Sequence, residues 1–308
     1  MHQILLITLS NIGDAIMTTP VLETLHYRFP AAKINIVSDH RSSEIFQHCP
    51  YIDHIFHKNK KEGWQGIIRL VRLLRAVRYD LVVDLRTDGL SYLLRAKKRL
   101  TKQKTKVDTT HAVIRHRAAL TPILTPEFPI PPCTVWIQEN YLEEATQKLA
   151  VMPHERILAI GLGANWPPKI WPTSEFSDLI SLIKDNFDSV ILVGNQNDRV
   201  YSQQIISTLP LPYLDLCGQT NLLQVAAILK QAQIFIGNDS GLGHLAAAVG
   251  TTTFTVFGPG NPDRYHPWGS YSRWQVAPDQ NLQNLKAADV KEQVLNLIQL
   301  TFQRKQFP

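Results

Sequence analysis

The amino-acid sequence predicts an α/β protein made of two similar halves, each a doubly wound parallel sheet covered by helices. The first observation behind this prediction is that short apolar runs of strand length alternate with longer stretches of helical periodicity. The second is that the same alternation begins again after Met152-Pro153-His154. We therefore expect a first domain at residues 1–152 and a second at 153–308, with the last helix, about 287–303, a candidate to pack back on the first domain.

In the first half, each expected strand is a short run rich in isoleucine, valine and leucine, bounded by polar or turn residues. The expected strands are at 4–9, 33–37, 52–57 and 80–85, and the expected helices at 15–29, 42–47 and 62–77. The run at 52–57 alternates polar and apolar residues, which is typical of an edge strand. Residues 95–106 carry seven basic side chains and no acidic one, and we expect a mobile basic loop there.

The second half repeats this pattern after a helix expected at 135–149. Its expected strands are at 157–162, 189–193, 213–216, 234–236 and 253–257, and its helices at 173–186, 198–209, 222–230 and 287–302. After the strand at 234–236, the residues from Asn238 to Ser240 can cap a helix, while Gly241 and Gly243 let backbone approach a ligand. The free N–H groups at such a helix start favour an anion, although an ordinary strand-to-helix turn has the same local pattern.

Charge is distributed unevenly along the chain. Residues 1–150 hold 21 Lys and Arg against 14 Asp and Glu, a balance of +7, whereas residues 151–308 hold 11 against 12, a balance of −1. The basic first half indicates an anionic partner or simply a solvated surface. The three cysteines form no C-x-x-C pair, which fits a reducing cytoplasm, and residues 1–7 are expected to be a strand rather than a secretion signal.

Three polar loops follow predicted strands and are expected to line one cleft, where parallel sheets hold their ligands. They are residues 10–14, residues 163–172 and the stretch beginning at Asp239. Lys169 lies among prolines and tryptophans and could neutralise a diphosphate, or it could pack its stem on Trp171. Asp14 could accept a proton from a substrate hydroxyl, or it could cap a helix. Because no Asp-x-Asp pair occurs, we expect no bound divalent metal, and no other cofactor is expected.

Four short motifs, in this order, resemble one known family, the ADP-heptose:lipopolysaccharide heptosyltransferases of glycosyltransferase family nine. They are Ser10-Asn11-Ile12-Gly13-Asp14-Ala15 with Thr19-Pro20, Lys169-Ile170-Trp171-Pro172, Asn238-Asp239-Ser240-Gly241 with His244-Leu245-Ala246-Ala247, and Phe257-Gly258-Pro259. The resemblance covers most of the chain. It implies the GT-B fold, in which two Rossmann-like domains face each other across a cleft, and it implies sugar transfer with inversion and without metal.

The resemblance also implies roles for individual residues. The catalytic base of the family matches Asp14, and its phosphate-binding lysine matches Lys169. Its donor-binding residues correspond to Asn165, Lys169, Asp198 near the ribose, Thr220 near the base, Asp239, Ser240, Gly241, Leu242 and His244. We expect the acceptor to lie against Asn11 and Gly13, with the basic residues Arg95, Lys97 and Lys98 contributing charge. The sequence departs from the family in the lysine loop, at Ala164 and Asn165, and in the acceptor half, which is short.

These expectations describe a monomeric cytoplasmic enzyme at the inner face of the inner membrane. The resemblance implies that it moves a heptose from ADP-heptose to an anionic, lipid-linked saccharide, with lipopolysaccharide core as the expected acceptor. The alternatives are a nucleotide-sugar 2-epimerase-like enzyme, a heptosyltransferase acting on a protein or another glycan, and a non-catalytic nucleotide-sugar binder. Nucleic-acid binding through residues 95–106 is disfavoured because aromatic residues are not interleaved with the basic ones.

Overall fold

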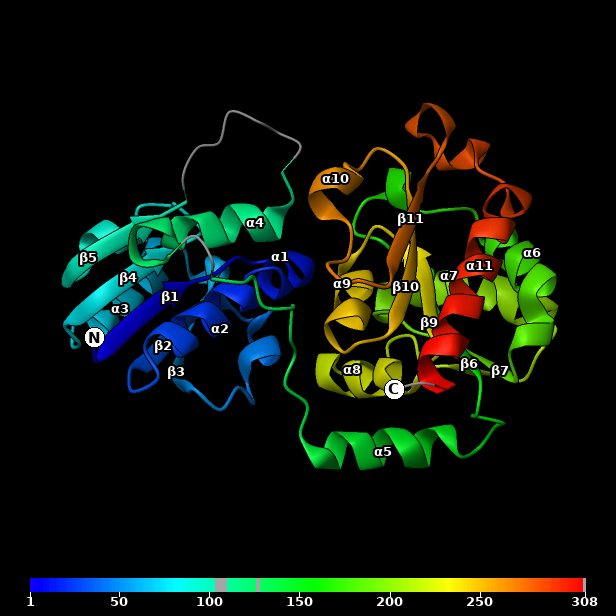
Figure 1. The fold of residues 1–308 in the computed structure, drawn as a ribbon, viewed down its shortest axis with the longest axis horizontal. Helices are drawn as coiled ribbons and strands as arrows, with labels where there is room; N and C mark the ends of the chain where they lie inside the picture. Colours follow the sequence, from blue (N-terminus) through cyan, green and yellow to red (C-terminus); the bar gives the residue numbers. More distant parts are fainter. Residues whose placement is uncertain (103–109, 126–127, 307–308) are drawn as a thin grey trace. The chain divides into compact units, whose positions relative to one another are not determined.

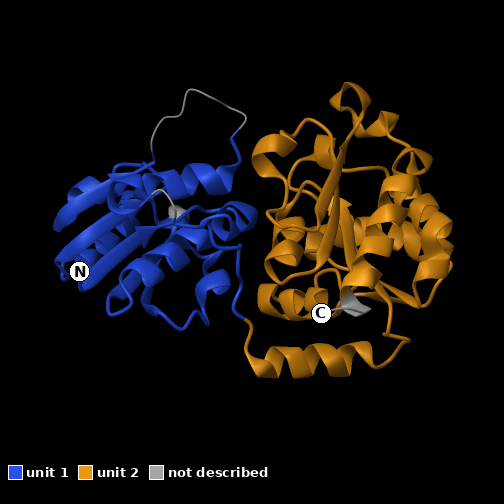
Figure 2. Cartoon of the chain, in the orientation of Figure 1, with its two compact units in different colours: residues 1–136 blue, residues 137–308 orange. Residues whose placement is uncertain are grey.

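The structure, a computed structural model, describes residues 1–102, 110–125 and 128–306. The chain divides into two compact units, residues 1–136 and residues 137–308 (Figure 2). Each unit is an α/β domain with one parallel sheet, so the predicted fold class is confirmed. The predicted basic residues Lys104 and Lys106 lie outside the described residues.

Unit 1 is built on a five-stranded parallel sheet in the order β3-β2-β1-β4-β5 (Figure 1). The strands are β1 (Gln3–Ile7), β2 (Lys33–Asp39), β3 (Ile52–Lys58), β4 (Tyr79–Asp84) and β5 (Ala96–Thr101). The helices are α1 (Ile12–Ile16), α2 (Thr19–Arg28), α3 (Gly63–Leu74) and α4 (Ala112–Arg117). The central strand β1 is apolar and fully buried from Ile4 to Ile7, because helices cover both faces of a parallel sheet.

Part of the predicted basic loop is the edge strand β5, which pairs in parallel with β4. Its lysines lie on an outer edge, where charged side chains are common because they discourage further strand pairing. The expectation of a mobile loop over residues 95–106 was therefore wrong for residues 96–101.

Unit 2 contains a six-stranded parallel sheet in the order β11-β10-β9-β6-β7-β8. The strands are β6 (Ile157–Gly161), β7 (Ser189–Leu192), β8 (Tyr213–Asp215), β9 (Ile234–Asn238), β10 (Thr252–Phe257) and β11 (Ser272–Val276). The helices are α5 (Glu139–Leu149), α6 (Thr173–Ile183), α7 (Arg199–Ile205), α8 (Leu222–Gln231), α9 (Gly241–Ala248), α10 (Pro262–Tyr265) and α11 (Ala287–Gln306). The strands β6, β9 and β10 are buried along their whole length and form the centre of this domain.

The boundary between the units falls before α5, earlier than the predicted boundary between residues 152 and 153. The reason is that α5 packs on α8 of unit 2. The Gln231 side chain donates hydrogen bonds to the Leu142 carbonyl at 3.3 Å and to the Thr146 hydroxyl at 3.0 Å. Such long-range contacts between two helices cannot be read from the local pattern that suggested the linker.

The closing helix α11 packs on α6 and β10 of its own unit. Its buried side chains, which include Val290, Val294 and Leu297, belong to the same core cluster as Phe176 of α6 and Phe254 of β10. This packing accounts for the apolar face of the helix.

Candidate active site

In unit 2, the loop after β6 carries Lys169 at the end of a short 3-10 helix, Pro167–Lys169. Trp171 anchors the loop in the core of unit 2. Its side chain is fully buried and donates through Nε1 to the Leu285 carbonyl at 2.9 Å. The prolines and the buried tryptophan restrict the backbone on both sides of Lys169. The loop is therefore a rigid support for one cation.

Asn238, at the end of β9, fixes the lysine loop to the sheet. Its buried side chain accepts a hydrogen bond from the Trp171 amide at 2.9 Å and donates one to the Leu162 carbonyl at 2.7 Å. It therefore spans the start and the end of the loop. The expected helix-capping role of Asn238 was wrong, because both polar ends of its amide are used by the neighbouring loop.

The ammonium group of Lys169 points to the carboxylate of Asp239, and Nζ lies 2.5 Å from Oδ2. The Asp239 side chain is 8% exposed and that of Lys169 is 24% exposed. An ion pair this sheltered is screened little by solvent, so a ligand that takes Lys169 must compete with Asp239. The pair also brings together two of the loops that the sequence predicted to converge.

The loop after β10 closes around the same carboxylate. A Cβ atom on Gly260 would lie 2.4 Å from Asp239 Oδ2, and one on Gly258 would lie 3.0 Å from the Pro168 carbonyl oxygen. A side chain at Gly260 would force the Asp239 carboxylate to shift, and one at Gly258 would make a tight contact with the backbone. Three loops from the carboxyl edge of one sheet thus meet within unit 2.

Helix α9 begins directly after Asp239, at the N-cap residue Ser240. The Ser240 hydroxyl makes no side-chain capping bond, and its buried oxygen has no hydrogen-bond partner within the described ranges of the chain. The first N–H groups of an α-helix have no partner inside the helix and carry partial positive charge. Next to Lys169, this helix start with Gly241 and Leu242 is suited to a negatively charged group.

The remaining expected donor residues differ in their surroundings. Asp198 is buried and its Oδ2 accepts a hydrogen bond from the Asn195 amide at 2.8 Å, so its carboxylate stabilises the turn after β7. Burial raises the pKa of Asp198. The Thr220 hydroxyl is buried with no hydrogen-bond partner in the described chain, whereas Asn165 is exposed and His244 is buried in α9. The predicted roles of these residues stay predictions.

In unit 1, Asp14 follows the carboxyl end of β1. Asn11 is the N-cap residue of α1, and Asp14 lies in the first helical turn, so the alternative that Asp14 caps this helix was wrong. The Asn11 amide donates to Asp14 Oδ2 at 2.9 Å. Asp14 is partly exposed while Gly13 is buried. This leaves a carboxylate that is oriented by a neighbour and accessible to a substrate.

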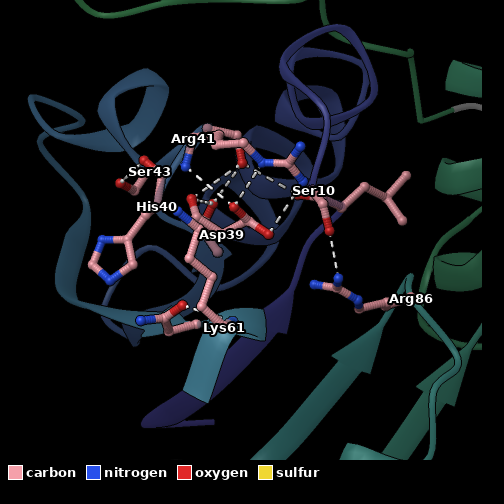
Figure 3. Close-up of polar contacts among 11 residues, drawn as sticks. Ser10, Asp39, His40, Arg41, Ser43, Lys61 and Arg86 are labelled. Atoms are coloured by element: carbon pink, nitrogen blue, oxygen red, sulfur yellow. Dashed lines mark hydrogen bonds and ion pairs between the residues drawn. The ribbon is translucent and has the colours of Figure 1, made fainter. Parts of the chain in front are cut away.

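Two basic residues at this edge of the sheet were missed in the sequence. Arg86 follows β4 and donates through Nη2 to the Ser10 hydroxyl (Figure 3), and its Nε lies 3.0 Å from Asp88 Oδ2. Lys58, the last residue of β3, forms an ion pair with the same Asp88 carboxylate. Burial opposes ionisation of Asp88, but the two cations outweigh it and hold its pKa below the ordinary value. Arg86 and Lys58 could have been predicted from their positions at the ends of two strands.

Arg95, Lys97 and Lys98 do not lie with Asp14. Parallel pairing aligns Ala96 with Tyr79, the first residue of β4, so these three residues are at the amino end of the sheet. Lys97 Nζ lies 2.7 Å from Asp80, whose carboxylate also accepts from the backbone of His2 at the start of the chain. Asp14 follows the opposite, carboxyl end of β1. The prediction that Arg95, Lys97 and Lys98 share one acceptor site with the loop of Asp14 was therefore wrong.

The described residues contain neither a metal-ligand cluster nor a membrane-spanning helix. No three His, Cys, Asp or Glu side chains among them lie close enough together to hold a metal ion. No helix in the described ranges combines the length and the apolar character needed to cross a bilayer.

Comparison with known proteins places this geometry in context. Residues 88–295 match the family model of glycosyltransferase family 9 (heptosyltransferase). Lipopolysaccharide heptosyltransferase 3 of Escherichia coli strain K12 is 26% identical over 283 residues, which cover 83% of this chain and 82% of the relative.

Two solved structures share the fold of the chain. The glycosyl transferase family 9 protein from Veillonella parvula superimposes with a TM-score of 0.87 at 20% identity, over 96% of this chain and 97% of that one. The Escherichia coli heptosyltransferase WaaC with ADP-2-deoxy-2-fluoro heptose superimposes with a TM-score of 0.75 at 21% identity, over 96% and 99%.

Proposed function

Since the chain belongs to glycosyltransferase family 9 and is therefore a glycosyltransferase, we propose that it transfers a heptose from ADP-heptose to a hydroxyl of lipopolysaccharide core. The observation that carries this proposal is the Lys169–Asp239 pair at the start of α9. It is supported by the relative that acts on lipopolysaccharide and by the similar structure with an ADP-heptose analogue. The reaction proceeds with inversion, by a single displacement at the anomeric carbon.

On the donor side, the diphosphate forms an ion pair with the ammonium group of Lys169 and accepts hydrogen bonds from the free N–H groups at the start of α9. These groups stabilise the negative charge that grows on the leaving ADP as the bond between the anomeric carbon and the phosphate oxygen breaks. Asp239, released from Lys169, accepts hydrogen bonds from the sugar hydroxyls. The Ser240 and Thr220 hydroxyls, which lack partners in the described chain, are further donor ligands.

On the acceptor side, Asp14 removes the proton of the attacking hydroxyl as its oxygen forms the new bond to the anomeric carbon. Asn11 holds the carboxylate for this step through its bond to Oδ2. Arg86, which donates to the Ser10 hydroxyl, and Lys58, which shares the Asp88 carboxylate with it, suit an anionic, lipid-linked saccharide. The enzyme works as a monomer on the cytoplasmic face of the inner membrane, in peripheral contact with it.

The proposal includes catalysis without a metal ion, because Lys169 and the α9 helix start supply positive charge at the diphosphate. Transfer measured in excess chelator should equal transfer without it. Loss of activity in chelator that is restored by one added divalent ion would contradict this part of the proposal.

The base assignment is tested by Asp14→Asn. We expect turnover to fall by about 10²- to 10⁴-fold, which is the usual contribution of a positioned base. ADP-heptose affinity, measured by calorimetry, should be nearly unchanged. Asp53→Asn is the control, since that carboxylate is on the edge strand β3 and pairs with Lys33 at 3.6 Å. Full activity of Asp14→Asn would remove Asp14 from the mechanism.

The epimerase-like alternative makes a different prediction about the donor alone. An epimerase converts a nucleotide-sugar without an acceptor, whereas the proposed transferase releases ADP in quantity only when acceptor is present. Incubating the chain with ADP-heptose alone, followed by chromatography of the sugar nucleotide, distinguishes the two.

A further inference from the structure

Helix α3 in unit 1 exposes an unusual amount of apolar surface. Of the 16 exposed large hydrophobic residues among the described residues, four lie on this helix: Trp64 (70%), Leu73 (54%), Ile67 (40%) and Ile68 (40%). The helix does not need them for its attachment to the sheet, because Leu70 and Leu74 are buried and belong to the core of unit 1. Trp64 and Ile68 lie one turn apart on the same face of this helix, and an exposed apolar patch of this kind indicates an interaction surface.

Arginines are interleaved with these apolar side chains on the solvent side of α3. Residues spaced by four lie in one row along a helix, so Trp64, Ile68 and Arg72 form such a row, with Arg75 at its end. Arg69 is paired with Glu62 at 3.1 Å. Arg72 and Arg75 form no ion pair within the described part of the chain, so their charge is available to a partner.

The short 3-10 helix η3 (Leu90–Leu93) extends this surface. Leu90, the first residue of η3, and Leu94, which follows it, are buried in the same core cluster as Leu70 and Leu74, so η3 and α3 cover the same face of the sheet. Tyr92 lies between Leu90 and Leu94 in the sequence, and its side chain is 72% exposed, slightly more than that of Trp64.

We infer that this face, formed by α3 and η3, binds the surface of an anionic lipid bilayer. Trp64, Ile68 and Tyr92 enter the headgroup layer, where amphipathic aromatic rings are favoured, and the arginines pair with lipid phosphates. The inference names the surface that makes the membrane contact in the proposed function, and it rests on that function for its biological setting.

Charge selects the bilayer over a second copy of the chain. Residues 61–78 hold five basic side chains and one acidic side chain, a balance of +4. Two such faces brought together in a symmetric dimer would place like charges opposite each other, whereas an anionic membrane is complementary to them. A long row of lipid phosphates also suits arginines that are spread along a helix rather than gathered in a pocket.

The test is sedimentation of the full chain with vesicles of phosphatidylcholine alone or mixed with phosphatidylglycerol. We expect binding to the mixed vesicles and little to phosphatidylcholine alone. The double variant Arg72→Gln/Arg75→Gln should bind the mixed vesicles roughly 30-fold more weakly. The double variant Trp64→Gln/Ile68→Gln should lose about tenfold or more.

Two matched controls change exposed residues of unit 2. Lys184→Gln/Lys230→Gln removes two charges and Val151→Gln/Val200→Gln removes two exposed apolar side chains, and both should bind vesicles as the unaltered chain does. Circular dichroism melting checks that every variant is folded. Equal binding by the α3 variants and the unaltered chain would overturn the inference.

Two further outcomes separate the explanations. Light scattering that shows a dimer, with the α3 variants monomeric and still bound to vesicles, would assign the face to a second copy and overturn the bilayer assignment. Heptose transfer to a water-soluble acceptor fragment should be unchanged in the α3 variants. A chain that binds vesicles through α3 but transfers no heptose would refute the proposed function and leave this inference standing.

Discussion

Asn238 offers the sharpest test of how the lysine loop is held. Replacing it with alanine removes a hydrogen bond at 2.9 Å from the Trp171 amide and one at 2.7 Å to the Leu162 carbonyl. Both backbone groups then lose their partner in a buried site. Each orphaned group costs about 1–3 kcal/mol, so we expect a loss in the free energy of unfolding of about 4 kcal/mol.

Thermal melting measures this loss, because two domains make a single free energy of unfolding poorly defined. Unit 2 spans residues 137–308, and for a domain of this size 1 kcal/mol shifts Tm by about 2–4 °C. Asn238→Ala should therefore lower the Tm of unit 2 by about 8–16 °C. It should also weaken ADP binding, since Lys169 is positioned by the same loop.

Asn35→Ala is the matched control, since Asn35 is an equally buried asparagine on β2 of unit 1. Among the residues that the structure describes, its side-chain amide makes one long hydrogen bond, 3.5 Å to the Tyr79 hydroxyl. We expect a smaller loss of stability there. If Asn238→Ala melts within about 2 °C of the unaltered chain, or no lower than Asn35→Ala, the proposed support of the loop is incorrect.

Two further predictions concern the surroundings of the site. Gly260→Ala would place a methyl group 2.4 Å from Asp239 Oδ2, so the Lys169–Asp239 pair must shift. We expect the affinity for ADP-heptose to fall about tenfold. The control, Gly269→Ala, should leave this affinity unchanged. An unaltered affinity in Gly260→Ala would show that the carboxylate can move without consequence. Burial lowers the pKa of His266, whose ring stacks on Trp274 at 4.1 Å. The unfolded chain therefore binds more protons, and stability is lost as pH falls below about 6.5. His266→Phe should show a smaller drop in Tm between about pH 7.5 and 5.5, and an identical drop would contradict the assignment.

The central strands could be predicted because their own residues determine them. In β6 and β9 apolar runs, and in β10 a run of threonines and apolar residues, are buried on both faces of the sheet, so sequence pattern and structure agree. The edge strands β5 and β11 were missed, because they face solvent and carry residues such as Lys98, Arg273 and Gln275 that resemble a loop.

The site was predictable in part for the same reason. Lys169 and Asp239 were expected at one edge because each follows a recognisable buried strand. Their direct pairing was not predicted, since a contact across 70 residues depends on the geometry of three loops. Arg86 and Lys58 were missed because neither belongs to a motif, and Lys97 was misplaced because its charge was read without its position along β5.

If the donor diphosphate engages Lys169 as proposed, the ion pair between Lys169 and Asp239 sets an order of events in turnover. A nucleotide-sugar donor that binds Lys169 breaks the ion pair with Asp239. Its sugar hydroxyls then donate hydrogen bonds to the Asp239 carboxylate, and these bonds offset the lost ion pair. Spent ADP engages the same lysine but brings no sugar, and its charged diphosphate then lies beside an anion that the lysine no longer neutralises. In the proposed mechanism, re-formation of the pair therefore favours release of the nucleotide, and the pair in the free enzyme disfavours binding of other anions at Lys169.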